Sequence, residues 1–267
     1  MNLLARKNPD DPSPLGWLTY RFVHAPLGAL KTRNADFLLY LLLGRRVCGG
    51  PFAGLRYVGS SPNSHIGDAL LGTLEKEVQP FLQSMLARTS DVFINVGGAE
   101  GYYAVGVARF SAVPRVIAFE SDRFGRVLIR YMARRNRVAD KLDVRGHCDP
   151  SALAAAMAPY SQPALLVDIE GFEKDVLDPT INPHLQRSTI IVELHETDAP
   201  MAEILRPRFA STHRIEEVWS QPRTLADLPN IPALAGLAFS RDRLVRFMDE
   251  RRGRAMRWWL LSPRPAS

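Results

Sequence analysis

Residues 92–102 decide the fold, and they read VFINVGGAEGY. The largely apolar run 92–96 leads directly into three glycines within residues 97–101, and a helical pattern opens after them. Glycine is needed where a strand turns sharply into a helix and where the backbone must approach a ligand closely. The stretch therefore predicts a buried strand, a tight turn and a helix start whose N–H groups favour a polar ligand.

Short β-rich runs alternate with helical stretches on the C-terminal side of this turn. We expect strands at residues 115–120, 142–145, 164–168, 189–194, 214–218 and 256–261. We expect helices at residues 103–110, 122–136, 150–157, 172–178 and 241–250. The runs 164–167 and 190–192 are wholly apolar, as in strands of a parallel sheet covered on both faces. The order predicts a doubly wound α/β fold, with the last two strands pairing antiparallel at one edge.

The N-terminal part of the chain is expected to be mainly helical. Helices are predicted at residues 15–30 and 35–43, before a Gly-Gly-Pro break at residues 49–51. From Ile66 to Leu82, apolar residues recur with helical spacing, which predicts one amphipathic helix laid on the core. Residues 1–65 are therefore expected to form an N-terminal extension packed on a main domain of residues 66–267.

Composition is that of an ordinary folded protein, since 46% of the 267 residues are hydrophobic and 23% are charged. The net charge of +6 suits an anionic partner such as RNA, although a solvated basic surface explains it more simply. The cysteines Cys48 and Cys148 lie too far apart in sequence to form a metal-ligand cluster. No apolar run has the length of a signal-peptide core or a membrane span, so a cytoplasmic protein is expected.

An acidic residue, Glu120, ends the expected strand 115–120, roughly twenty residues beyond the glycine turn. At that spacing a carboxylate can accept hydrogen bonds from both ribose hydroxyls of a nucleoside bound across the turn. Glu120 could instead be an acid stabilised at a helix N-terminus. The turn and the acid together favour a bound nucleoside, and they leave NAD open as the ligand.

Polar side chains also follow the next strands. Asp149 precedes Pro150, which predicts a helix N-cap, while His147 and Cys148 are placed where they could form the wall of a ligand site. Asp168 directly follows a fully buried strand, where a carboxylate needs a specific partner. His195 follows the fifth strand and can take a substrate proton near neutral pH.

Three segments carry a family resemblance. Residues 92–103 resemble the cofactor-binding motif of class I S-adenosylmethionine-dependent methyltransferases, and residues 165–177 and 190–195 are similar to motifs of the FkbM-type subgroup. The resemblance covers about residues 66–200, with a weaker echo at residues 257–261. It implies a Rossmann-like, seven-stranded, mostly parallel sheet with an antiparallel last strand. It also implies S-adenosylmethionine as cofactor and O-methylation of a hydroxyl on a small molecule or sugar.

The resemblance also implies roles for individual residues. Those expected to bind the cofactor are Asn95, Gly97, Gly98, Ala99, Glu100 and Gly101 for the methionine part, Glu120 and Ser121 for the ribose, His147, Cys148 and Asp149 for the adenine, and Asp168 near the sulfonium. His195 is the first candidate for the catalytic base, and Asp168 or Glu170 is the second. No metal is expected, and a divalent ion bridging Asp168 and Glu193 is the minority alternative.

One residue departs from the family pattern. Asn95 stands where the family has an acid, so a charge that would face the ammonium group of the cofactor is missing, and Glu100 is the residue that could replace it. Two other functions stay open: ribose methylation of RNA, and binding without catalysis. Methylation of exocyclic base nitrogens is disfavoured, because residues 168–171 read DIEG and lack the Pro-Pro-aromatic run common in those enzymes.

Overall fold

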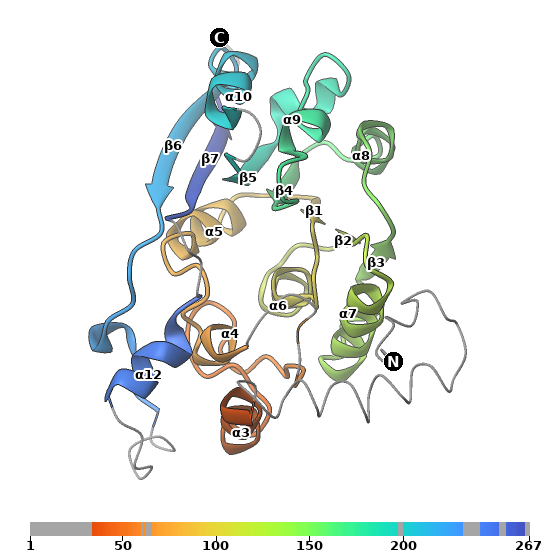
Figure 1. Cartoon of the computed structure of the whole chain (residues 1–267). Helices are drawn as coiled ribbons and strands as arrows, with labels where there is room; N and C mark the ends of the chain where they lie inside the picture. The colour runs from red at the N-terminus through yellow and green to blue at the C-terminus, as the bar shows by residue number, and fades with distance from the viewer. Residues whose placement is uncertain are drawn as a thin grey trace, which may run out of the picture.

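The computed structural model describes residues 34–59, 61, 66–196, 200–231, 241–250 and 255–264. These residues form a seven-stranded sheet of order β3-β2-β1-β4-β5-β7-β6 (Figure 1). The strands are β1 Val92–Val96, β2 Val116–Phe119, β3 Leu142–Arg145, β4 Pro163–Val167, β5 Thr189–Leu194, β6 His213–Trp219 and β7 Arg257–Pro263. β1 to β5 pair in parallel, and β7 lies antiparallel to both β5 and β6. The predicted Rossmann-like, doubly wound sheet with an antiparallel last strand is confirmed.

Helices cover both faces of the sheet and create two hydrophobic cores. On one face lie α5 Gln79–Leu86, α6 Tyr102–Phe110 and α7 Arg123–Arg135, and on the other lie α8 Pro150–Met157, α9 Glu173–Val176 and α10 Met201–Phe209 (Figure 1). Phe93 and Ile94, neighbours on β1, belong to different cores. Two-sided burial explains why the central strands β1, β4 and β5 carry few polar side chains.

The helix predicted over residues 66–82 is wrong, because two short helices occupy this stretch. α4, Gly67–Leu71, ends at Gly72, whose φ of 75° is left-handed. A Cβ at Gly72 would lie 2.0 Å from the carbonyl carbon of Gly49, so the two loops cross there in backbone contact. The apolar spacing continues across this break because α4 and α5 both contribute to the same core.

The N-terminal region lies against the helix that follows the glycine turn. α3, Asn34–Leu42, matches its predicted helix closely, whereas the helix predicted at residues 15–30 lies outside the described residues. Phe52 is buried against Tyr102 of α6, with ring centroids 5.2 Å apart. A Cβ at Gly106 would come within 2.6 Å of the Phe52 ring, so packing here is close. The domain boundary at residue 65 stays a prediction.

The remaining described helices are η3 Pro183–Arg187, η4 Leu225–Asp227 and α12 Arg241–Met248. Cys48 and Cys148 are both free thiols. Of the helices in the described ranges, none combines the length and apolarity needed to cross a bilayer.

Candidate functional site

The glycine turn after β1 is in backbone contact with the segment after β4. Gly97 has a φ of 89°, and a Cβ placed on it would lie 1.8 Å from the carbonyl oxygen of Asp168. The N–H of Asp168 donates to the carbonyl of Val96 over 2.9 Å, which continues the strand pairing to this point. Only glycine permits this approach. The contact brings the expected cofactor turn directly beside the first of the expected catalytic carboxylates.

Four N–H groups of the turn are used within the protein. Those of Gly97 and Gly98 donate to the carbonyl of Phe119 over 3.0 and 2.9 Å, and that of Gly101 donates to Gly98 over 2.8 Å. The N–H of Ala99 donates to the carboxylate of Glu120 over 2.6 Å. At these positions the glycines therefore provide shape and close approach, not N–H donors for a ligand.

Glu120 points back over the turn. Its Oε2 accepts from Ala99, and its Oε1 accepts from the N–H of Asp122 over 2.7 Å. Burial raises the pKa of Glu120, and these two hydrogen bonds oppose the rise. Each carboxylate oxygen keeps acceptor capacity after one hydrogen bond. The carboxylate is thus fixed beside the turn and can still accept from a ligand hydroxyl. Ser121 next to it is exposed.

Asn95 on β1 and Glu100 in the turn that follows it are both buried. The carboxylate of Glu100 accepts from the hydroxyl of Tyr57 and from Oγ of Ser61, the latter over 2.7 Å. The side-chain amide of Asn95 donates to the carbonyl of Gly97 over 3.3 Å. Burial and the charge of Glu100 raise the pKa of Tyr57, so its hydroxyl remains a donor. Sequence reasoning missed Tyr57 and Ser61, because nothing near them signals contact with a turn about forty residues away.

The segment after β3 has one buried and two exposed expected site residues. His147 and Asp149 are exposed and Cys148 is buried. Oδ1 of Asp149 accepts from the N–H of Ala152 over 2.8 Å, which confirms the predicted N-cap of α8. Burial raises the pKa of Cys148 to about 12, so the neutral thiol is an apolar surface.

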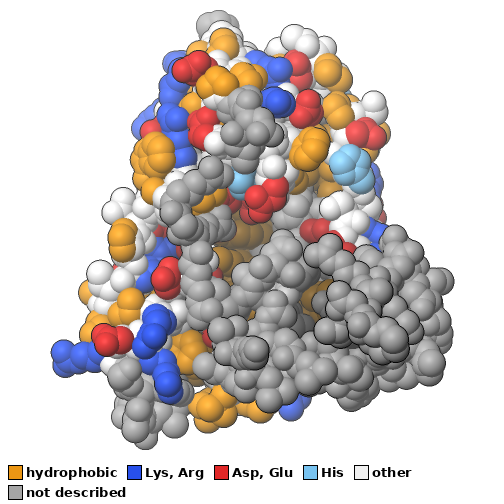
Figure 2. All heavy atoms as spheres, in the orientation of Figure 1, with side chains coloured by type: hydrophobic (Ala, Val, Ile, Leu, Met, Phe, Trp, Pro, Cys, Tyr) orange, Lys and Arg blue, Asp and Glu red, His pale blue; other side chains and the backbone are white. Residues whose placement is uncertain are grey.

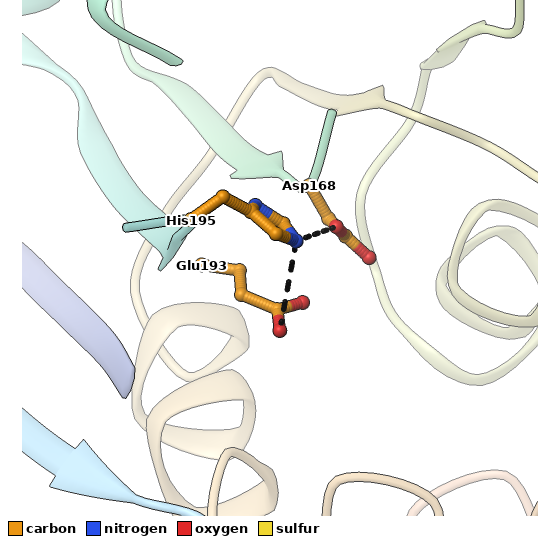
Figure 3. Close-up of side chains that lie close together, drawn as sticks. All are labelled: Asp168, Glu193 and His195. Atoms are coloured by element: carbon orange, nitrogen blue, oxygen red, sulfur yellow. Dashed lines mark ion pairs between the residues drawn. The ribbon is translucent and has the colours of Figure 1, made fainter. Parts of the chain in front are cut away.

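A cluster of carboxylates surrounds His195 at the ends of β4 and β5. Nε2 of His195 lies 3.7 Å from Asp168, 3.8 Å from Glu193 and 3.5 Å from Glu170. Figure 3 shows the imidazole of His195 turned toward Asp168 and Glu193. Nδ1 of His195 forms a 2.8 Å hydrogen bond with Glu173. The three expected catalytic residues, His195, Asp168 and Glu170, therefore lie together.

Glu173 organises this cluster, although its sequence position suggests only a helix cap or a loop charge. It is fully buried, and its Oε1 accepts from the N–H groups of Ile169 and Gly171 over 3.3 and 3.2 Å as well as contacting His195. These bonds hold a turn in which Glu170 and Gly171 have φ values of 56° and 105°. The interpretation of Glu173 as a helix cap or an exposed loop charge is wrong, because the residue is fully buried and the pairing of β4 with β5 brings His195 to it.

The charges around His195 affect its titration. Burial lowers its pKa, but the hydrogen bond to Glu173 and the charges of Asp168 and Glu170 outweigh burial, so the pKa of His195 is raised overall.

Glu196, one residue further on, has a structural role, since its carboxylate accepts a hydrogen bond from the N–H of Met201 over 2.8 Å at the start of α10. Figure 2 shows acidic side chains and a histidine beside a hollow in the centre of this face, with hydrophobic side chains deeper inside.

No family model matches the chain, and no curated protein matches it in sequence. Among solved structures, the O-methyltransferase TomG of tomaymycin synthesis from Streptomyces achromogenes is 12% identical, with 70% of this chain and 80% of that chain covered at a TM-score of 0.45. An O-methyltransferase from Bacillus cereus is 13% identical over 87% of this chain and 91% of that chain, with a TM-score of 0.43. A precorrin 8w decarboxylase from Methanobacterium thermoautotrophicum is 18% identical over 70% of this chain and 89% of that chain, with a TM-score of 0.45. Likenesses this distant assign no activity, so function must be inferred from the side chains of the site.

Proposed function

We propose that this protein is an S-adenosylmethionine-dependent methyltransferase that methylates a hydroxyl on a small molecule or sugar. The observation that carries this proposal is the carboxylate of Glu120, bound to the N–H of Ala99 and thereby held over the glycine turn. In a doubly wound sheet that binds a nucleoside, an acid at the end of the second strand accepts hydrogen bonds from the ribose hydroxyls. The Gly97–Asp168 contact supports the proposal, because a cofactor bound at the turn would have the carboxylate cluster beside its reactive end.

The cofactor would lie across the ends of β1, β2 and β3. Glu120 and the adjacent Ser121 would hold the ribose, and residues 147–149 would line the adenine. The methionine part would lie against residues 95–101, where Glu100 supplies the charge that Asn95 lacks. The hydroxyls of Tyr57 and Ser61 support this role of Glu100, because their hydrogen bonds hold its carboxylate in the buried turn.

The methyl group would pass directly from the sulfonium to the acceptor oxygen. An oxygen–carbon bond forms as the sulfur–carbon bond breaks, and the electron pair of the broken bond stays on sulfur. Because the donor is already activated by its positive charge, alignment and exclusion of water supply much of the acceleration. The acceptor proton has three candidate destinations at this edge: His195 first, and Asp168 or Glu170 second. All three lie within one cluster.

Calorimetric titration tests the cofactor assignment. We expect S-adenosylmethionine and S-adenosylhomocysteine to bind with one site per chain, and NAD titrated in parallel to give no binding. Glu120→Gln removes the charge that accepts the ribose hydroxyls. Since a hydrogen bond to a charged group contributes about 1.5–3 kcal/mol, the affinity of this variant for S-adenosylmethionine should be roughly tenfold to a hundredfold lower than that of the unaltered protein.

Glu216→Gln is the matched control, because Glu216 lies on the edge strand β6 and pairs there with Arg214. Its affinity for the cofactor should equal that of the unaltered protein. Binding of NAD in place of S-adenosylmethionine, or equal affinities in Glu120→Gln and the control, would contradict the proposal.

A second candidate acceptor is an RNA ribose. The exposed face of α7 carries Arg123, Arg130 and Arg134, which lie on one side of that helix at the spacing of helical turns. Cationic side chains in such a row can neutralise phosphates. An RNA affinity that falls steeply with salt would favour this acceptor over a small molecule.

A further inference from the structure

His195 presents one ring nitrogen to a gap between carboxylates. The residue is 2% exposed, and Nδ1 is already bound to Glu173. The carboxylate oxygens of Glu170, Asp168 and Glu193 lie 3.5, 3.7 and 3.8 Å from Nε2. Ordinary hydrogen bonds to nitrogen span about 2.7–3.2 Å, so each of these oxygens stands too far away for a good one. The three oxygens converge on Nε2 without touching it.

We propose that Asp168, Glu193 and His195 form a binding site for a divalent metal ion. One nitrogen and two carboxylate oxygens of these residues lie within 4.8 Å of one another (Figure 3). Bonds of about 2.0–2.3 Å to a shared ion keep two ligand atoms within about 4.6 Å of each other, and the 3.7 and 3.8 Å that separate Nε2 of His195 from Asp168 and Glu193 fall within this limit. The role of the ion in catalysis rests on the proposed function, whereas its binding can be measured without the cofactor.

The hydrogen bond between His195 and Glu173 supports this site independently. A histidine that binds a metal almost always donates its other ring N–H to a carboxylate or carbonyl, which fixes its tautomer and orientation. Glu173 is fully buried and lies 2.8 Å from Nδ1. With the proton on Nδ1, the lone pair of Nε2 faces Asp168 and Glu193. The lone pair of Nε2 and the two carboxylates repel one another, and a cation bound between them would attract all three.

The charge at the site also favours a divalent ion. Four carboxylates, those of Asp168, Glu170, Glu173 and Glu193, lie within 3.8 Å of a ring nitrogen of His195. Even a protonated imidazole offers only one positive charge to them. Glu193 is fully buried, so a cation beside it would offset part of the cost of removing its carboxylate from water. Because the ligand set mixes imidazole with carboxylates, Mn²⁺, Fe²⁺ or Zn²⁺ suits it better than Ca²⁺.

Three protein ligands leave coordination positions open for the acceptor. Its hydroxyl oxygen would bind the ion, which lowers the pKa of the hydroxyl. Nε2 of His195, as a ligand, then cannot take the proton. The proton passes instead to the carboxylate of Glu170, which is 81% exposed and can release it to water. The resulting oxygen anion attacks the methyl carbon, and the electron pair of the sulfur–carbon bond remains on sulfur.

Manganese titration tests the site. The full chain, stripped with a chelator and then dialysed, is titrated with Mn²⁺ while the signal of the free ion is followed by electron paramagnetic resonance. We expect one Mn²⁺ per chain. Asp168→Asn and His195→Gln should each weaken binding roughly tenfold or more. Glu216→Gln, which removes an equal charge on the distant edge strand β6, should bind Mn²⁺ as tightly as the unaltered protein.

Asp168→Asn is the decisive variant, because Asp168 is partly exposed and asparagine preserves its shape, so we expect this variant to fold. Absence of Mn²⁺ binding at millimolar concentration, or binding unchanged in Asp168→Asn, would overturn the metal site. S-adenosylmethionine is titrated separately with the chelator present. Cofactor binding without Mn²⁺ binding would contradict only the proposed metal site. Mn²⁺ binding without cofactor binding would contradict only the proposed methyltransferase function.

Discussion

Gly97 sets the distance between the turn that follows β1 and the cluster that follows β4. Its left-handed φ of 89° and the 1.8 Å approach that a Cβ would make to the Asp168 carbonyl are two separate demands for glycine. The left-handed φ would strain the backbone of any other residue at this position, and the close approach would bring a side chain into collision with the carbonyl group of Asp168. The glycine turn and the carboxylate cluster can lie side by side only because no side chain stands between them at this residue.

The Gly97→Ala substitution separates these two demands when it is compared with Gly54→Ala. Gly54 has nearly the same φ, 92°, but a Cβ there would meet no atom within 4 Å. We expect Gly54→Ala to lose about 1–2 kcal/mol of unfolding free energy from backbone strain alone. Gly97→Ala should lose more than about 3 kcal/mol, or fail to fold. Urea denaturation measures both, and equal losses would show that the Asp168 contact is not tight.

At the scale of elements, sequence patterns predicted strands better than contacts between segments. β1, β3, β5 and α8 have the predicted bounds, because sharp changes from apolar to polar or glycine residues mark their ends. α10 was not predicted, and Pro207 lies within it. The role of Glu173 was missed because it depends on β4 pairing with β5, which brings His195 to it across about twenty residues of chain. Such pairings are set by the sheet as a whole.

β6 carries a buried histidine whose titration should be visible in stability. Nδ1 of His213 lies 2.8 Å from the hydroxyl of Thr212, and Nε2 lies 3.0 Å from the carbonyl of Ser188, which precedes β5. Burial lowers the pKa of His213, with Arg264 adding to the effect and the bond to Ser188 opposing it. The folded protein therefore favours the neutral imidazole.

The sign of the pH effect follows from this lowered pKa. The contribution of His213 is complete above the unfolded pKa of about 6.5 and is lost as pH falls through the lower folded pKa. Unfolding free energy should therefore decline from pH 7 to pH 5 more steeply in the unaltered protein than in His213→Gln. Each unit of pKa difference corresponds to about 1.4 kcal/mol. His147→Gln, at an exposed position, serves as the control, and parallel slopes in all three proteins would refute the assignment.

On the scale of the whole molecule, the N-terminal region and the sheet share one core. Leu39, Phe52, Leu55 and Tyr57 are buried in the same cluster as Val105 of α6. Tyr57 also contacts the glycine turn through its hydrogen bond to Glu100. Sequence patterns predicted an extension packed on the main domain but not which of its residues meet which helix, because hydrophobic spacing shows which residues are buried and not what they pack against.

Truncation tests how far the main domain depends on this region. A protein of residues 66–267 loses the side chains of Phe52, Leu55 and Tyr57 and exposes the apolar surface that they cover. Loss of a single such side chain costs roughly 2–5 kcal/mol, so the shortened protein should lack a cooperative unfolding transition. A protein of residues 34–267, which keeps every described residue, is the reference for circular dichroism. Cooperative unfolding of residues 66–267 would show that the domain folds without the extension.

The most direct measurement of the central claim is a crystal structure of the protein soaked with S-adenosylhomocysteine. The ribose hydroxyls should lie within hydrogen-bond distance of the Glu120 carboxylate, with the sulfur directed toward Asp168 and His195. A nucleoside bound elsewhere on the molecule, or a ribose that makes no contact with Glu120, would contradict the methyltransferase assignment.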